Sequence, residues 1–166
     1  MNKNLILVAD NIRSAQNVGS LFRTAECLGV KMIYLCGYTP YPTEENDSRL
    51  PHIARKNEYL ISKTALGANS YIKWSHFDNI QLLIEKLKKD GFFIIALEQS
   101  SKSILLNELK IKHSKIALIV GNELKGVSED VLNLADIISE IKMEGKKESL
   151  NVVQAAAIAI YAILNI

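Results

Sequence analysis

The stretch NLILVADNIRSAQNVGSLFRTAECLGVKMIYLC, residues 4–36, predicts a strand, a helix and a second strand. The apolar runs at 4–9 and 31–36 have the length of strands, and each is followed by turn-forming residues. Between them, apolar residues recur at helical spacing over 17–29. Because two parallel strands need a long crossover, usually a helix, this order favours a parallel sheet.

Within the predicted helix, one apolar stripe faces the core and one charged residue lies almost opposite. The stripe comprises Val18, Leu21, Phe22, Ala25 and Leu28. The opposite residue is Arg23. On this count Arg23 is a solvated surface residue, unless another part of the chain needs a positive charge there.

The rest of the chain continues the alternation of short apolar runs and amphipathic segments. Further strands are predicted at 71–74, 92–97, 115–120 and 137–143, and further helices around 51–60 and at 77–89. The fold class is therefore α/β, a mostly parallel sheet with helices on both faces. The long irregular stretch 37–51 predicts a surface loop, and loops of this length often serve function.

Composition indicates an ordinary globular protein. The chain has 166 residues, of which 48% are hydrophobic and 23% charged, so we expect one domain spanning 1–166 without a disordered tail. The net charge of +2 permits an anionic partner without requiring one. The apolar run at 5–9 is too short for a signal or membrane segment, which favours the cytoplasm.

Cysteine and histidine spacing argues against a metal site. Cys27 and Cys36 lie in apolar segments without a CxxC motif, and we expect both to be reduced core residues. His52, His76 and His113 are scattered singly, so no zinc-ligand spacing exists and no metal is expected.

The final segment, 152–166, is apolar nearly all round, interrupted only by Gln154, Tyr161 and Asn165. A helix of this kind is buried on more than one side. We expect it to pack on its own sheet and on a second copy of the chain, forming a homodimer. Its length and polar residues argue against a membrane span.

Three loops that follow predicted strands are chemically unusual, and ligands bind at such exits in α/β sheets. They cover 96–101, 121–128 and 144–152. Taken singly, each has a simpler explanation: an exposed serine loop, a tight turn in GNELKG, and Ser149 as a helix N-cap. The sequence has no GxxxxGK[ST], GxGxxG or GxSxG motif, which weakens P-loop, standard dinucleotide and hydrolase assignments.

Three longer motifs, in order, resemble a known family. NIRSAQNVGSLFRTAECLGV, IALIVGNELKGVS and IKMEGKKESLNVVQAAAIAIY are similar to the motifs of the SpoU/TrmH family of RNA 2′-O-methyltransferases, in the SPOUT superfamily. The resemblance extends from about residue 10 to the end of the chain. KTALGA, at 63–68, is similar to single-domain members.

The resemblance implies a SPOUT fold with a C-terminal trefoil knot, a rare exception to unknotted topology. It also implies that S-adenosylmethionine is the cofactor and that the active site lies at the interface of a homodimer. By matching motif positions, the cofactor-binding residues would be Leu97, Glu98, Gly121, Asn122, Glu123, Ile141, Met143, Ser149 and Leu150.

For catalysis, the resemblance implies that Arg23 acts in the partner subunit's site. A guanidinium is almost never deprotonated, so we expect Arg23 to hold a phosphate and stabilise the developing alkoxide rather than act as a base. The residues expected to orient the ribose hydroxyl and its proton path are Asn17, Glu123, Ser149 and Asn151. Arg13 is expected to contact RNA phosphate, with simple surface exposure as the alternative.

One position departs from the family pattern. Many relatives have Ile-Pro-Met in the third motif, where this chain has Lys142 between Ile141 and Met143. The loop therefore lacks a fixed φ angle.

The substrate is expected to be tRNA or rRNA, with tRNA favoured because minimal single-domain relatives include enzymes that modify it. Multidomain relatives carry an extra RNA-binding domain that is not expected here, so RNA selection would rest on the dimer surface, including 37–51 and the lysine clusters, or on a partner protein. The alternatives are a SPOUT enzyme that methylates a base, a non-catalytic RNA-binding module and a generic flavodoxin-like protein.

Overall fold

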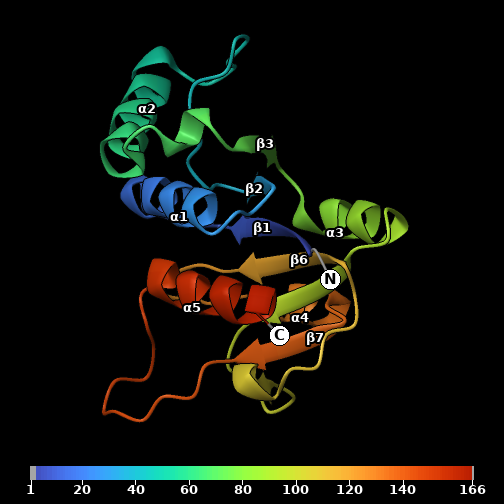
Figure 1. The fold of residues 1–166 in the computed structure, drawn as a ribbon. Coiled ribbons are helices and arrows are strands. Elements are labelled where there is room, and N and C mark those ends of the chain that lie inside the picture. The colour runs from blue at the N-terminus through green and yellow to red at the C-terminus, as the bar shows by residue number, and fades with distance from the viewer. Residues whose placement is uncertain (1–2, 166) are drawn as a thin grey trace.

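The computed structural model describes residues 3–165, whose strands form one sheet in which every pairing is parallel (Figure 1). The strands are β1 (Asn4–Asp10), β2 (Met32–Cys36), β3 (Lys73–Phe77), β4 (Phe93–Leu97), β5 (Ile104–Leu105), β6 (Lys115–Val120) and β7 (Ile137–Glu140). Their order is β3-β2-β1-β6-β4-β7-β5. The predicted α/β class and parallel sheet are confirmed.

Helices cover both faces of this sheet. They are α1 (Ala15–Cys27), α2 (Pro51–Ala65), α3 (Ile80–Lys89), α4 (Glu129–Leu134) and α5 (Val152–Asn165), with 3₁₀ turns at Ala68–Ser70 and Leu106–Glu108. α1 and α5 pack on one face and α3 and α4 on the other. α2 packs against α1 and lies beyond it in Figure 1.

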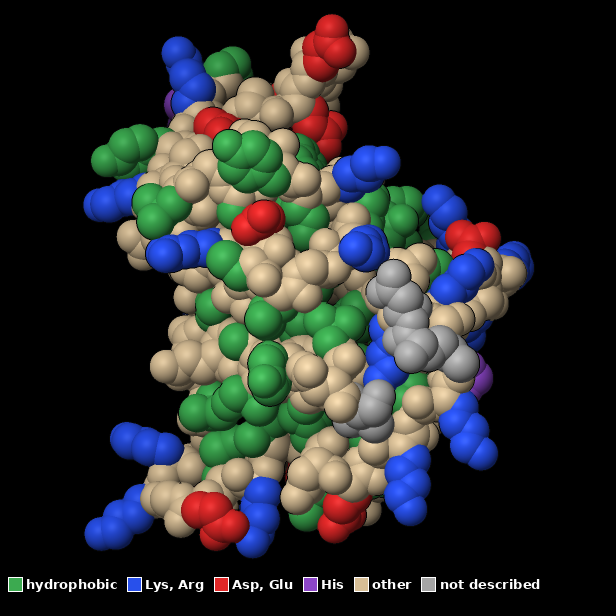
Figure 2. Space-filling view, in the orientation of Figure 1, with side chains coloured by type: hydrophobic (Ala, Val, Ile, Leu, Met, Phe, Trp, Pro, Cys, Tyr) green, Lys and Arg blue, Asp and Glu red, His purple; other side chains and the backbone are tan. Residues whose placement is uncertain are grey.

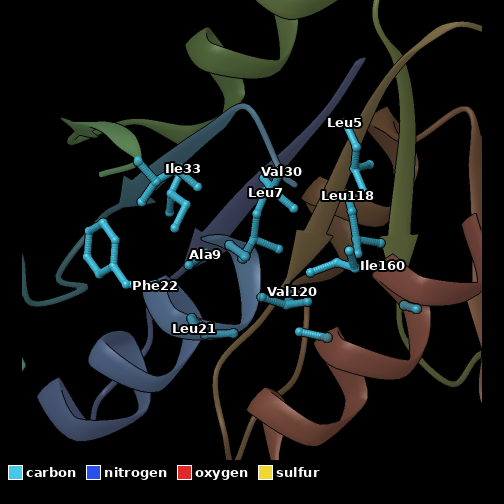
Figure 3. Close-up of a cluster of buried hydrophobic side chains, with 14 of the residues drawn as sticks. Leu5, Leu7, Ala9, Leu21, Phe22, Val30, Ile33, Leu118, Val120 and Ile160 are labelled. Carbon is cyan, nitrogen blue, oxygen red and sulfur yellow. The ribbon is translucent and has the colours of Figure 1, made fainter. Parts of the chain in front are cut away.

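The central strand β1 shows how the sequence builds two cores. Leu5 and Leu7 point into the cluster beneath α1 and α5 (Figure 3). Ile6 and Val8 point to the other face, into the cluster beneath α3 and α4. Alternate residues of a strand point to opposite faces, so a strand buried on both faces must be apolar throughout. The run NLILVA meets this requirement.

Side-chain caps set two helix starts that the apolar pattern misplaced. Ser14 Oγ accepts the N–H of Asn17, so α1 begins at Ala15 and not at residue 17. Asn79 Oδ1 accepts the N–H of Leu82, so α3 begins at Ile80 and not at residue 77.

Other boundaries also differ from the prediction. The strand expected at 71–74 lies at Lys73–Phe77, because KWSHF pairs with β2 although it is only half-buried and has no apolar run. The strand expected to reach residue 143 ends at Glu140, and α2 continues to Ala65. β5, α4 and the two 3₁₀ turns were not anticipated, because each is too short to show a period.

The prediction that both cysteines are core residues is wrong for one of them. Cys36 is buried in β2, but Cys27 is exposed at the end of α1. Cys27 follows the buried Ala25 by two positions, which places it about 200° around the helix from that residue. It therefore lies off the buried stripe, whose Val18, Leu21 and Phe22 are buried as predicted.

α5 buries one stripe within this chain and leaves another open. Ala156, Ala159 and Ile160 are fully buried, whereas Ile158 and Tyr161 are 44% and 63% exposed. Figure 2 shows hydrophobic side chains gathered over this part of the surface. The partner expected on the open stripe stays a prediction, as does the knot. Among the helices of the described chain, none is long and apolar enough to cross a membrane.

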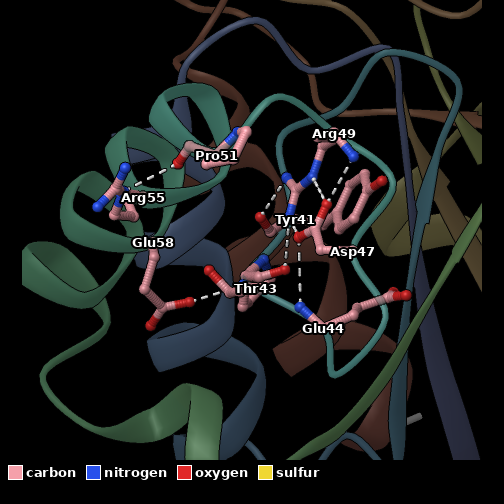
Figure 4. A network of polar contacts seen from close by, with 9 residues as sticks. Tyr41, Thr43, Glu44, Asp47, Arg49, Pro51, Arg55 and Glu58 are labelled. Carbon is pink, nitrogen blue, oxygen red and sulfur yellow. Dashed lines mark hydrogen bonds and ion pairs between the residues drawn. The ribbon is translucent and has the colours of Figure 1, made fainter.

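The predicted loop at 37–51 contains no helix or strand before α2, yet its own contacts hold it (Figure 4). The Arg49 guanidinium lies 3.5 Å from the centroid of the Tyr41 ring and donates to the carbonyl oxygens of Tyr41 and Pro42. It also pairs with Asp47, and this hydrogen bond holds the pKa of the Asp47 carboxyl well below its usual range. The other face of Tyr41 meets His76 at a centroid distance of 4.2 Å.

Candidate functional site

A cavity of about 280 Å³ opens at the carboxyl ends of β4, β6 and β7. This volume is near the lower end of the range for small-molecule sites. Its walls come from three segments that are distant in sequence. The lining residues are Leu97, Glu98, Gln99, Val120, Gly121, Asn122, Glu123, Leu124, Lys125, Gly126, Glu140, Ile141, Met143, Ser149, Leu150, Val152 and Ala155.

All nine residues expected to bind the cofactor line this one cavity. Leu97 and Glu98 come from the end of β4, the GNE residues follow β6, and the others come from the segment between β7 and α5. The sequence placed seven of them on three separate loops, and Ile141 and Met143 at the end of a predicted strand; the parallel strand order brings these segments together. Their role in binding stays a prediction.

The cavity combines an apolar wall with uncommitted backbone. Leu97, Ile141 and Met143 are half-buried and line it with Leu150. Within the described chain, no backbone N–H of residues 141–150 donates a hydrogen bond. Backbone N–H groups without partners can bind the polar edge of a heterocycle, and an apolar wall beside them can bind its flat face.

The GNELKG segment is a tight hairpin held by Asn122. The backbones of Asn122 and Gly126 exchange two hydrogen bonds of 2.9 and 3.1 Å. Asn122 Oδ1 accepts the N–H groups of Leu124 and Lys125, both at 2.9 Å. The GNELKG segment is therefore a tight turn, as its simpler explanation held, and it also forms one wall of the cavity.

Glu98 holds the other side of this hairpin by hydrogen bonds from backbone N–H groups. Its carboxylate accepts the N–H of Val127 at 2.8 Å and that of Gln99 at 2.9 Å. Gly126 has a φ of +67°, and a Cβ there would lie 2.0 Å from Glu98 Oε2. Only glycine tolerates both the left-handed backbone and the close carboxylate. Glu98 thus shapes the cavity as well as lining it.

Glu123 joins the hairpin to the start of α1. Its carboxylate accepts the N–H groups of Arg13 and Ser14, at 2.9 and 3.1 Å, and the side-chain amide of Asn17 at 2.9 Å. Partial burial acts to raise the pKa of Glu123, but the hydrogen bonds from Arg13, Asn17 and Ser14 outweigh it and lower the pKa overall. Glu123 is therefore an ionised acceptor and a poor proton base at neutral pH.

Asn17 is oriented by this contact. Its Nδ2 donates to Glu123, and no residue of the described chain donates to its Oδ1. The fixed amide therefore presents a free acceptor beside the cavity rim. The structure brings Asn17 and Glu123 together, and their action on one hydroxyl stays a prediction.

Arg23 does not join them within this chain. It is exposed, does not line the cavity, and makes no hydrogen bond or ion pair with any residue from 3 to 165. Arg13 is also exposed and contributes only its backbone N–H to Glu123. Both side chains are available to an external anion.

The last two predicted residues occupy different positions. Ser149 is exposed and lines the cavity. Asn151 is the cap of α5, because its Oδ1 accepts the N–H of Val153 at 2.8 Å and its carbonyl accepts that of Ala155. The simpler interpretation of Ser149 as the N-cap is therefore wrong by two residues.

Sequence reasoning missed several residues at the site. Gln99 donates from Nε2 to the Glu148 carbonyl, which ties two walls of the cavity together. The Tyr38 hydroxyl accepts a hydrogen bond from Asn122 Nδ2. No pattern signals either contact, since each joins loops that only the fold brings together. Within residues 3–165, no group of three His, Cys, Asp or Glu could hold a metal ion.

Comparison with known proteins agrees with this architecture. The model of the SpoU rRNA Methylase family matches residues 4–161. A tRNA (guanosine(18)-2′-O)-methyltransferase of Borreliella burgdorferi is 32% identical over 161 residues, covering 96% of this chain and 66% of that protein.

Solved structures share the fold. The TrmH/SpoU tRNA modifying enzyme of A. aeolicus has a TM-score of 0.79 at 28% identity, over 98% of this chain and 75% of that one. An AdoMet-bound rRNA methyltransferase of Sinorhizobium meliloti has a TM-score of 0.81 at 20% identity, over 98% of this chain and 56% of that one. The chain thus spans 66% of the Borreliella protein, 75% of the A. aeolicus structure and 56% of the Sinorhizobium structure. Because the family model matches residues 4–161, the chain belongs to the SpoU rRNA methylase family.

Proposed function

We propose that this protein transfers a methyl group from S-adenosylmethionine to a ribose 2′-hydroxyl of RNA, and that tRNA is its substrate. One observation carries the proposal: in a chain of a methylase family, three separate loops converge on one cavity and include every residue expected to bind the cofactor.

The residues present fit this cofactor. Leu97, Ile141 and Met143 would hold the adenine. The backbone N–H groups of the cavity-lining residues between 141 and 150, which donate no hydrogen bond within residues 3–165, would bind its polar edge. When bound, S-adenosylmethionine would supply a methyl group on a positively charged sulfur: a hydroxyl oxygen can form a bond to the methyl carbon while the carbon–sulfur bond breaks, with the neutral thioether as leaving group and the hydroxyl proton released to water. Ser149, exposed at the same cavity, is proposed to orient the ribose hydroxyl with Asn17 and with the side-chain NH₂ of Asn151, whose Oδ1 caps α5.

Asn17 and Glu123 have distinct roles in this scheme. Asn17 Oδ1, to which no described residue donates, accepts a hydrogen bond from the ribose hydroxyl and so orients the lone pair of the hydroxyl oxygen. Glu123 holds the Asn17 amide in place. The lowered pKa of Glu123 suits this positioning role better than proton removal.

Arg23 supplies positive charge from a second copy of the chain. A guanidinium can hold a phosphate in a forked hydrogen-bonded pair and stabilise an alkoxide as it forms. Within residues 3–165 Arg23 makes no hydrogen bond or ion pair and does not line the cavity of its own chain, which is consistent with a site shared between subunits.

The proposed working form is a homodimer of single-domain chains in the cytoplasm, without a metal. The open stripe of α5, with Ile158 and Tyr161, supports the dimer because partly exposed apolar helix faces mark protein contacts. The Borreliella and Aquifex relatives named for tRNA support tRNA as the substrate, and the family's rRNA name keeps rRNA as the second candidate.

A methyl-transfer assay tests the proposal. Purified protein is incubated with labelled S-adenosylmethionine and, separately, total tRNA or total rRNA. We expect label in tRNA, and a loss of about 100-fold or more in Arg23→Ala, the scale seen when one transition-state donor is removed. Arg55→Ala is the matched control, because Arg55 is an exposed arginine on α2 outside the cavity. Label in neither pool would refute the proposal.

A further inference from the structure

Tyr38 is an exposed aromatic side chain that is held in one orientation beside the cavity. Its side chain is 59% exposed, yet its hydroxyl accepts a hydrogen bond of 2.8 Å from Asn122 Nδ2. Its backbone N–H donates to Asn11 Oδ1 at 3.2 Å. The ring is thus fixed at its far edge and at its backbone, while most of its surface faces solvent.

The residues around Tyr38 form a built support. Asn11 has a φ of +53°, and its own side chain is oriented by a hydrogen bond from Nδ2 to Asp10 Oδ1 at 3.1 Å. Gly37 has a φ of +61°, and a Cβ there would lie 2.2 Å from Asn11 Oδ1. The second Asn122 Nδ2 hydrogen donates to the Asn11 carbonyl at 2.8 Å. One asparagine therefore fixes both the hairpin of the cavity and the Tyr38 ring.

No other exposed tyrosine is held in this way. Tyr59, Tyr71 and Tyr161 are 66%, 81% and 63% exposed, and within residues 3–165 none of their hydroxyls makes a hydrogen bond. Without a hydrogen bond at the hydroxyl, those rings have more freedom to lose, so ordering them on a ligand would cost more entropy. Tyr38 is the exposed tyrosine of the described chain that is already ordered.

The position of Tyr38 indicates a ligand with a flat face. Asn122 lies between the ring and the cavity, and Asn122 is followed by Glu123, whose partner is Asn17. An RNA that presents a ribose to this rim must place a base close to the same rim. Proteins bind unpaired RNA bases by stacking them on aromatic rings.

We infer that the Tyr38 ring is a stacking platform for a base of the RNA at the methylation site. This inference rests on the proposed function and adds an RNA-binding residue to it. The Arg13 backbone N–H donates to Glu123, the residue that follows Asn122, and the exposed Arg13 side chain makes no ion pair within residues 3–165, so it is available to a phosphate of the same RNA.

Three variants separate stacking from a structural role. Tyr38→Leu keeps apolar bulk but removes the ring, Tyr38→Phe keeps the ring but removes the bond to Asn122, and Tyr71→Leu is the control at an unanchored exposed tyrosine. The measurements are KM and kcat for total tRNA and total rRNA as separate substrates, with S-adenosylmethionine affinity by calorimetry.

We expect Tyr38→Leu to raise the KM for RNA about ten- to hundredfold, the range for loss of one stacked base, with unchanged cofactor affinity. Tyr38→Phe should stay within about threefold of wild type, because ring stacking persists. Equal losses in Tyr38→Leu and Tyr38→Phe, or a wild-type KM in Tyr38→Leu, would overturn the inference alone. Absence of methyl transfer by the wild-type protein would overturn the proposed function and this inference with it.

Discussion

Glu123→Gln perturbs the contact that joins the cavity hairpin to α1. The carboxylate accepts three hydrogen bonds, two from backbone N–H groups and one from Asn17. The glutamine amide has one oxygen, so its NH₂ group must face at least one of these donors. Hydrogen bonds to a charged group contribute about 1.5–3 kcal/mol and neutral ones about 0.5–1.5 kcal/mol.

The expected loss of stability is about 2 kcal/mol, because one bond is lost, two are weakened, and water reaches this half-exposed site. For a chain of this size that corresponds to a fall in Tm of roughly 4–8 °C. Catalysis should fall further, about tenfold or more in kcat, because Asn17 loses the partner that orients it.

The stability difference between wild type and Glu123→Gln should depend on pH in a known direction. The pKa of Glu123 is lower in the folded protein than its ordinary value, so its stabilisation is present at neutral pH and is lost as pH falls through the folded pKa. The Tm difference between wild type and Glu123→Gln should therefore shrink between about pH 7 and pH 3. Calorimetric melting measures it, with Glu85→Gln on the exposed face of α3 as control. A difference that is absent at pH 7, or that grows in acid, would refute the reasoning.

The remaining predictions concern three other parts of the fold. Gly126→Ala should weaken S-adenosylmethionine binding at least tenfold by calorimetry, because a left-handed alanine costs about 1–2 kcal/mol and its Cβ would also clash with the Glu98 carboxylate. Gly145→Ala is the control, because there is open space around its Cβ, and it should bind the cofactor normally. Equal affinities in the two variants would contradict this account. A thiol reagent should label the exposed Cys27 in the native protein at pH 7, but should label Cys36 only after unfolding, because burial encloses the Cys36 thiol and raises its pKa. Mass spectrometry of digests distinguishes the two sites, and labelling of Cys36 in the native protein would contradict this prediction. Ile158→Asp should shift the protein from dimer to monomer in sedimentation at micromolar concentration, because it places a charge on the open stripe of α5; an unchanged mass would exclude this face from the interface.

The sequence was most informative where one rule dominates. The apolar runs at 4–9 and 115–120 predicted the buried central strands, because a strand covered on both faces needs apolar side chains at nearly every position. Val18, Leu21 and Phe22 likewise marked the buried face of α1. In these elements the local pattern and the tertiary environment agree.

Prediction failed where tertiary contacts override local pattern. KWSHF became an edge strand through pairing with β2, and Asn79 moved the start of α3 by capping it. At the site, motif matching located the nine cavity residues, but it could not show that Glu98, Asn122 and Glu123 are held by hydrogen bonds to the loops around them. Those contacts join segments more than 25 positions apart, so only the folded chain displays them.

The most direct test of the proposed reaction is the position of the transferred methyl group. RNA labelled by the wild-type protein is hydrolysed in alkali, which cleaves each phosphodiester through a free 2′-hydroxyl and so spares the bond beside a methylated ribose. The account predicts that the label remains in alkali-resistant dinucleotides and is lost in Arg23→Ala. Label in mononucleotides would place the methyl group on a base and contradict the proposed 2′-O-methylation.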